Sequence, residues 1–209
     1  MGRNAHAALA ALVLSVAFLV WPALASARPG VAAPPVGIRF ATLPGLQTGP
    51  APWGPGSSSP LHARLARLGL PILTEEQLET HIHAHLDVYV HGVHVPVPPL
   101  VGIDVVDRFL TVLHTHDASG VVHIESASSV PYVLGMFFGV WGVRLDARCI
   151  GRYCGDSAAR LRAFVGGRAY HGDPSAIILR EREEIVLTYG TKAQLPDPVP
   201  VRFAFAQGL

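Results

Sequence analysis

The segment from Thr80 to His91, THIHAHLDVYVH, alternates polar and apolar residues almost without interruption. Side chains on a β-strand point to opposite faces in turn, so a period of two predicts a strand that is apolar on one face only. The polar face would carry His81, His83, His85, Asp87, Tyr89 and His91. The other face would carry Ile82, Ala84, Leu86, Val88 and Val90. Such a strand belongs in a sheet that covers a hydrophobic core with one face and presents imidazoles on the other.

A second pair of histidines, His114 and His116, lies in the segment LTVLHTHDASGVVHIES. The residues DASG predict a hairpin turn, and two registers are compatible with it. With a glycine bulge, Thr115 faces His123, which puts His123 on the opposite face from the histidine pair. With a plain two-residue loop, His114 pairs directly with His123. The turn chemistry favours the glycine bulge.

The rest of the pattern predicts an α+β domain with a mostly antiparallel sheet and one packed helix. In YVLGMFFGVWG, large apolar residues recur at helical spacing before Gly142, and LHARLARLGL reads as a short helix ended by Gly69 and Pro71. RLRAFVGGRAY, SAIILREREEIVLTYG and PVRFAFA read as strands. Besides the apolar face of 82–90, the predicted core comprises Leu134, Phe137, Phe138, Trp141, Ile178, Ile185 and Leu187.

The N-terminal part of the sequence predicts export. Residues 1–27 combine a short positive region, an apolar run and the small residues Ala25-Ser26-Ala27, which is typical of a signal peptide cleaved after Ala27. An uncleaved N-terminal membrane anchor is the alternative, and Pro22 and the ASA site favour cleavage. Residues 28–60 are rich in Pro and Gly and predict a disordered linker, followed by a single histidine-rich domain over 61–209.

The chain has two cysteines, Cys149 and Cys154, in CIGRYC. In an exported protein, this spacing predicts a disulfide that closes a small loop. A zinc site is disfavoured because two thiolates do not complete one.

The histidine pattern predicts a transition-metal site. Adjacent members of an H-x-H pair on a strand lie about 6.5–7 Å apart, so two of them can converge on one ion, whereas the ends of an H-x-H-x-H triplet cannot easily do so. We expect the ligands to be His83, His85, His114 and His116. Further candidates are His81, His123, Asp117 and Glu125. Imidazole donors favour copper or zinc over hard cations.

Two other interpretations of the histidines stay open. The imidazoles can be polar residues on a solvated sheet face, or they can form a pH-sensing group that becomes mutually repulsive near pH 6. Asp87, Asp117 and Glu125 are the carboxylates that would complete a metal site or orient a ring nitrogen. The remaining histidines in turns and loops read as solvated, namely His62, His91, His94 and His171.

Composition restricts the partners. The formal net charge is +1, and no basic run appears, so no nucleic-acid partner is expected. No second apolar run is long enough to span a membrane, so no membrane contact is expected after signal cleavage. The sequence contains no G-x-S-x-G elbow, Gly-rich phosphate loop or H-E-x-x-H helix, which leaves enzymatic activity undecided. A protein partner is not indicated.

The blocks HIHAHLDVYVHG, LHTHDASGVVHIES and YVLGMFFGVWG resemble the recurring motifs of a family of uncharacterised exported bacterial proteins, over residues 61–190. The resemblance implies that the histidines of the first two blocks, including His123, belong to one pattern, and it implies no reaction. The order of hairpin, helix and returning strands is also similar to a β-grasp ligand-binding domain. We therefore expect an exported copper- or zinc-binding protein that handles or sequesters metal. A metal-dependent hydrolase or oxygenase is the first alternative, and a metal-free extracellular binding or adhesion module is the second.

Overall fold

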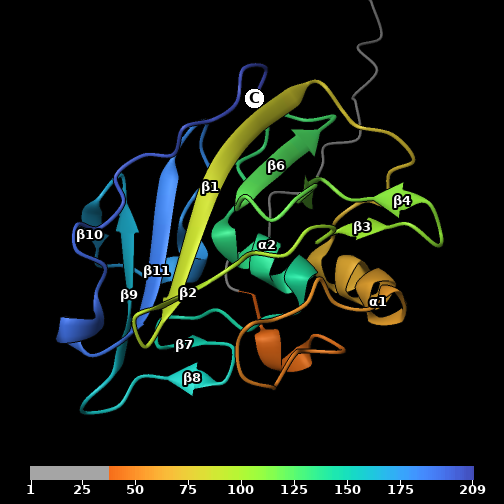
Figure 1. The fold of residues 1–209 in the computed structure, drawn as a ribbon. Helices are drawn as coiled ribbons and strands as arrows, with labels where there is room; N and C mark the ends of the chain where they lie inside the picture. Colours follow the sequence, from red (N-terminus) through yellow and green to blue (C-terminus); the bar gives the residue numbers. More distant parts are fainter. Residues whose placement is uncertain (1–37) are drawn as a thin grey trace, which may run out of the picture. The chain divides into compact units, whose positions relative to one another are not determined.

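The computed structural model describes residues 38–209, and the predicted signal peptide lies outside them. The described part is an α+β structure built around a seven-stranded mixed sheet (Figure 1). The strands of this sheet follow the order β10-β9-β11-β1-β6-β5, and β2 pairs with β1 beside this path. Their bounds are β1 Thr80–Val90, β2 Val93–Val95, β5 Leu113–His114, β6 Val121–Ser126, β9 Arg160–Val165, β10 Arg168–Tyr170 and β11 Glu184–Gly190. The two-stranded sheets are β3 Ile103–Asp104 with β4 Phe109–Leu110, and β7 Cys149–Ile150 with β8 Tyr153–Cys154.

The predicted fold class is confirmed at the level of α+β. The sheet is mixed and mostly antiparallel, because β1 and β11 pair in parallel while the other pairs in the sheet are antiparallel. The two α-helices are α1 Ser58–Leu68, which begins three residues before the predicted short helix, and α2 Leu134–Trp141, the predicted packed helix. Three short 3-10 helices complete the described elements, η1 Phe40–Thr42, η2 Pro174–Ala176 and η3 Lys192–Gln194. A β-grasp topology is not confirmed.

The turns follow the local sequence. β1 reverses into β2 through His91 and Gly92, both with positive φ, which suits the right-handed twist of a two-residue hairpin. Gly166 and Gly167 make the corresponding turn between β9 and β10. The helices end as predicted, because Gly69 and Gly142 adopt the left-handed conformation that terminates α1 and α2. The disulfide Cys149–Cys154 joins β7 to β8 and is confirmed.

The apolar face of β1 lies in the core. Ala84, Leu86, Val88 and Val90 are buried in one cluster with the side chains of α2, while Ile82 is half-buried at its edge. The predicted core residues of α2 and β11 are also buried, namely Leu134, Phe137, Phe138, Trp141, Ile185 and Leu187. Ile178 was expected in the core, but 37% of it is exposed. The extended chain there alternates, so Ile177 and Leu179 point inward and Ile178 points outward.

Residues 28–60 were predicted to be a disordered linker, but from residue 38 onward this segment is folded against the rest of the domain. Phe40, Leu43 and Trp53 are buried, and the ring of Trp53 packs edge-on against Trp141 with the centroids 5.8 Å apart. α1 begins at Ser58, inside the predicted linker. The prolines and glycines of this segment therefore form turns between buried apolar residues. The high content of Pro and Gly led to the prediction of disorder, whereas the few apolar residues determine the structure.

Arg64 connects this segment to the two helices. Its side chain is fully buried, and its guanidinium donates hydrogen bonds to Val140 O, from Nε at 3.2 Å and from Nη2 at 3.0 Å, and to Pro44 O at 3.4 Å. Val140 lies in the last turn of α2, where carbonyl groups lack partners within the helix and attract positive charge. Burial lowers the pKa of Arg64.

Two of the segments that were predicted as strands are not strands along their whole length. From Ser175 to Glu183 the chain forms the end of η2, a short extended stretch and a turn, and only Glu184–Gly190 is a strand. The predicted final strand at 200–206 is irregular. Phe203 instead stacks on the ring of His85, with the centroids 3.8 Å apart and the planes at 8°.

Phe138→Ala should lower the free energy of unfolding by about 3–5 kcal/mol, because Phe138 is fully buried between the sheet and the helices and its loss leaves a cavity. Urea unfolding measures the change. Val106→Ala is the matched control, because Val106 is 78% exposed and its truncation should change stability by no more than about 0.5 kcal/mol. Equal stabilities of the two variants would contradict the core packing described here.

Candidate metal centre

The central strands bring five of the histidines together on one face of the sheet. In the pairing of β1 with β6, His83 lies opposite His123 and His81 lies opposite Glu125. In the pairing of β6 with β5, His123 lies opposite His114. His116 follows β5 and reaches the same place. We call this group the histidine cluster; it consists of His81, His83, His114, His116, His123 and Glu125.

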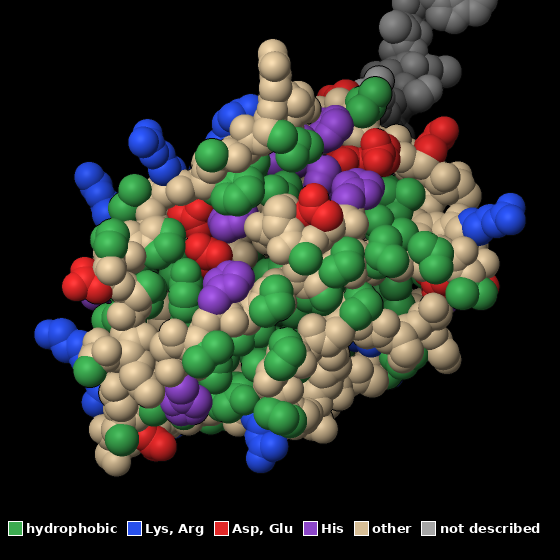
Figure 2. All heavy atoms as spheres, in the orientation of Figure 1, with side chains coloured by type: hydrophobic (Ala, Val, Ile, Leu, Met, Phe, Trp, Pro, Cys, Tyr) green, Lys and Arg blue, Asp and Glu red, His purple; other side chains and the backbone are tan. Residues whose placement is uncertain are grey.

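The histidine cluster lies on the face opposite the hydrophobic core. Strand alternation forces this, because the neighbours of His83 in β1, Ile82 and Ala84, pack toward the core. Figure 2 shows histidine and acidic side chains gathered on one part of the surface near β1 and β6. Four members of the cluster are nevertheless buried, namely His83, His114, His123 and Glu125.

The position of His123 corrects the register that the turn chemistry favoured. His114 pairs with His123, which is the arrangement that was expected only for a plain two-residue loop. The reason is that Thr115 leaves the hairpin and exchanges backbone hydrogen bonds with Leu100 and Val101. The carbonyl of Gly120 accepts a bond from Leu86 N of β1 instead. These contacts with other segments, and not the turn residues, set the register.

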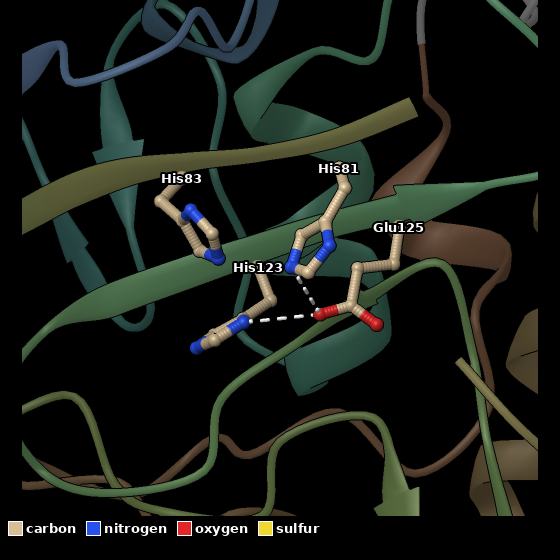
Figure 3. Close-up of side chains that lie close together, drawn as sticks. All are labelled: His81, His83, His123 and Glu125. Atoms are coloured by element: carbon tan, nitrogen blue, oxygen red, sulfur yellow. Dashed lines mark hydrogen bonds and ion pairs between the residues drawn. The ribbon is translucent and has the colours of Figure 1, made fainter. Parts of the chain in front are cut away.

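Around β1 and β6, His81 and His123 contact the Glu125 carboxylate, and His83 lies beside these two histidines (Figure 3). Glu125 Oε1 lies 3.1 Å from His123 Nδ1 and 3.4 Å from His81 Nε2. The ring of His83 lies beside both neighbours, with its centroid 4.9 Å from that of His81 and 4.6 Å from that of His123. His83 Nε2 is buried and has no hydrogen-bond partner among the described residues.

Around β5 and β6, His114 and His116 face each other. His114 Nδ1 donates to Thr111 O at 2.9 Å, so its Nε2 presents a lone pair. That Nε2 lies 3.2 Å from His116 Nε2 and 3.8 Å from Glu125 Oε1. Two nitrogens bound to one tetrahedral zinc ion at about 2.0–2.1 Å lie about 3.3 Å apart, so the separation of the two rings fits a shared ion. The bond to Thr111 also resembles the backbone contact that orients metal-binding histidines.

The electrostatics of the histidine cluster favour neutral imidazoles. Burial lowers the pKa of His114 to about 4, and burial followed by the nearby His123 and His81 lowers the pKa of His83. Burial by itself would raise the pKa of Glu125, but the hydrogen bond with His123 and the charges of the surrounding histidines outweigh it, so the pKa is lowered. The cluster at neutral pH therefore holds unprotonated His83 and His114 beside an ionised carboxylate, which is the state a metal ion requires.

The structure does not bring His85 into the histidine cluster. Its Nδ1 lies 2.9 and 3.0 Å from the two Glu184 oxygens, and its Nε2 lies 2.8 Å from Ser119 O. Both ring nitrogens are therefore engaged by hydrogen-bond partners, and neither offers a free lone pair to a metal ion. Although burial opposes it, the hydrogen bond and charge of Glu184 raise the pKa of His85. The expected pairing of His83 with His85 is therefore replaced by the pairing of His83 with His81.

The other predicted carboxylates lie elsewhere. Asp117 Oδ1 accepts the backbone N–H of Ser119 at 2.8 Å and stabilises the turn, and Asp87 contacts His94 Nε2 at 3.1 Å. Two acidic residues near the cluster were not predicted from the sequence. Glu181 Oε2 accepts the backbone N–H of His83 at 2.9 Å, and Glu76 Oε1 lies 3.6 Å from His116 Nε2.

These two acidic residues carried no signal in the sequence because neither shares a strand or a periodic pattern with the histidines. Only the folded chain brings Glu76 and Glu181 to the two ends of the histidine cluster.

Three of the four histidines predicted to be solvated are exposed, namely His91, His94 and His171. The fourth, His62, is partly buried against the ring of Phe109, with the centroids 4.5 Å apart.

Comparison of the chain with protein-family models, with curated proteins and with solved structures finds no match in any of the three. The resemblance to exported bacterial proteins stays an expectation. Among residues 38–209, no helix has the length and apolar character needed to cross a membrane.

The pKa of His114 predicts a pH dependence of stability for the metal-free protein. Its pKa is about 4 in the folded state, and an unperturbed histidine titrates near 6.5. Between these values the unfolded chain binds a proton that the folded chain does not, so the free energy of unfolding should fall by on the order of 3 kcal/mol as the pH drops. Below about pH 4 this group has no further effect.

Urea unfolding from pH 7.5 to pH 4 measures this dependence, because His114→Asn should remove this part of the slope. His171→Asn is the control, since that side chain is exposed and the substitution should leave the slope as in the wild type. Identical slopes for His114→Asn and the wild type would show that His114 is protonated equally in both states.

Proposed function

We propose that this domain binds a transition metal, copper or zinc, through the histidine cluster, and that it handles or sequesters that metal outside the cytoplasm. The observation that carries the proposal is the convergence of imidazoles and one carboxylate around buried donor atoms that have no other use. His83 Nε2 and Glu125 Oε2 are buried without a hydrogen-bond partner among the described residues. Unpaired buried polar atoms are costly, and a metal ion would satisfy both.

The burial of the histidine cluster argues against a solvated polar face. Surface histidines would project into water, whereas His114 is fully buried and His83 and His123 are 4% and 8% exposed. The same burial weakens the pH-sensing interpretation, because it lowers the pKa of His114 to about 4, below the pH range of such a sensor, and lowers the pKa of His83 as well. Five imidazoles against one carboxylate favour a borderline or soft ion over magnesium or calcium.

The location outside the cytoplasm is supported by the Cys149–Cys154 disulfide, since such bonds persist mainly in oxidising compartments. The predicted signal peptide agrees with it, although residues 1–27 lie outside the described part of the chain.

A metal-dependent hydrolase or oxygenase is the second candidate. The observation that favours it is partial exposure of the cluster, since the side chains of His81 and His116, one in each part of it, are 36% and 44% exposed. An ion bound by either of these histidines would keep a coordination position open to water, and a bound water of lowered pKa is a nucleophile. A metal-free binding module is the third candidate, and it gives no reason for the unpaired donors.

His123→Ala should weaken metal binding by about ten-fold or more, because His123 lies between the other histidines and loss of even an outer contact has an effect of that size. The mature protein is stripped with a chelator, and binding of Zn²⁺ and Cu²⁺ is measured by calorimetry and elemental analysis. For the wild type, metal at a hundred times its Kd should raise the stability by about 2.7 kcal/mol.

His171→Ala is the control, since His171 is exposed and remote from the cluster, and it should bind as the wild type does. Circular dichroism verifies that His123→Ala is folded. A wild type that binds neither ion, or a folded His123→Ala protein that binds both with unchanged affinity, would refute the proposal. The enzymatic candidate requires in addition that the zinc-loaded protein hydrolyse an activated ester faster than the metal-free protein does. The zinc-loaded His171→Ala control should show the same activity as the zinc-loaded wild type.

A further inference from the structure

The histidine cluster contains more donors than one ion can use. It offers five imidazoles and one carboxylate, whereas copper and zinc in histidine sites take four ligands, of which water is commonly one. Two donors bound to the same ion at about 2.1 Å lie no more than about 4.2 Å apart. A single ion at the centre would therefore require all the donor atoms to approach one another closely.

The donor atoms form two groups instead of one. The first consists of His81, His83, His123 and Glu125, and the second of His114, His116, His123 and Glu125. Within each group the donor atoms lie within 4.8 Å of one another, and no group among the described residues joins His81 and His83 to His114 and His116. Each group has two histidines of its own, and the two groups share His123 and Glu125.

Glu125 is placed to serve both groups at once. Its Oε1 lies 3.4 Å from His81 Nε2 on the first side and 3.8 Å from His114 Nε2 on the second. Its Oε2 is buried and has no partner in the described part of the chain. A carboxylate with two available oxygens can bridge two ions, and the buried position of Glu125 keeps it from turning into solvent.

The charges around the cluster agree with two ions. Glu125 is not the only carboxylate near the cluster, because Glu181 lies at one end, beside the backbone of His83 and the side chain of Arg182, and Glu76 lies at the other, beside His116. With these two included, three carboxylates run along the cluster, one at each end and one between the groups. Two cations held by neutral imidazoles need this distribution of negative charge, because like charges this close would otherwise repel each other strongly.

We propose that the histidine cluster is a dinuclear centre, in which His81 and His83 hold one ion, His114 and His116 hold a second, and Glu125 bridges the two. This inference rests on the proposed metal-binding function and adds the number of ions and the division of the ligands between them. His123 supports the bridge, since its Nδ1 lies 3.1 Å from Glu125 Oε1.

The test is the stoichiometry of the mature chain and of two paired variants. Zn²⁺ titration followed by elemental analysis should give two ions for the wild type. His81→Ala/His83→Ala and His114→Ala/His116→Ala should each retain one ion.

In the protein loaded with two equivalents of Cu²⁺, bridging should couple the spins, so electron paramagnetic resonance should detect fewer than two spins per chain. Each paired variant should give one full spin, and Glu125→Gln should release the coupling.

Single variants guard against misfolding of the paired ones. His81→Ala and His116→Ala change half-exposed side chains, and each should weaken a different one of the two binding steps. Saturation of the wild type at one ion, with that ion lost from both paired variants, would overturn the dinuclear centre and leave the proposed function standing. Weakening of the same step by both single variants would also overturn it. Failure of the wild type to bind any ion would remove the proposed function as well.

Discussion

The strict alternation of β1, at the centre of the sheet, is the constraint on which the rest of the structure depends. Its apolar side chains join α2 in the core, and its polar side chains form one wall of the histidine cluster. Because the two sets are interleaved along one backbone, packing of Leu86 and Val88 fixes the positions of His81 and His83. A shift of one residue would exchange the faces, so the hydrophobic core itself holds the candidate site in register.

The neighbours of β1 decide what each polar residue does. Toward β6 and β5, His83 meets His123, and the site becomes a group of neutral imidazoles around Glu125. Toward β11, His85 lies opposite Glu184, hydrogen-bonds to its carboxyl group and stacks on Phe203. The pKa values of these two histidines, two residues apart on one strand, are thus shifted in opposite directions, because one is desolvated among other imidazoles and the other is paired with a carboxylate.

The sequence predicted much of this with elementary rules. The β1 strand, its turn into β2, the glycine ends of the two helices, the disulfide and the buried face of α2 followed from periodicity and turn chemistry. Local patterns failed where distant segments compete for the same backbone. Backbone hydrogen bonds of Thr115 with Leu100 and Val101 change the register of the hairpin. Phe203 stacks on the ring of His85 and is not part of a strand. The prediction of a disordered linker was wrong for residues 38–60, because burial of Phe40, Leu43 and Trp53 orders a segment that is otherwise rich in Pro and Gly.

The sequence by itself determined which residues carry the chemistry, since the spacing of the histidines in β1 and around β5 puts each H-x-H pair on one side of its strand. Only the tertiary structure decided how they combine. It placed His123 and Glu125 between the pair His81 and His83 and the pair His114 and His116. It also placed Glu76 and Glu181 at the ends of the histidine cluster, and His85 against Glu184. The physical reason is that alternation fixes the face of a side chain within its own strand, whereas the side chain it meets depends on strand order and register, which arise from contacts far apart in the chain.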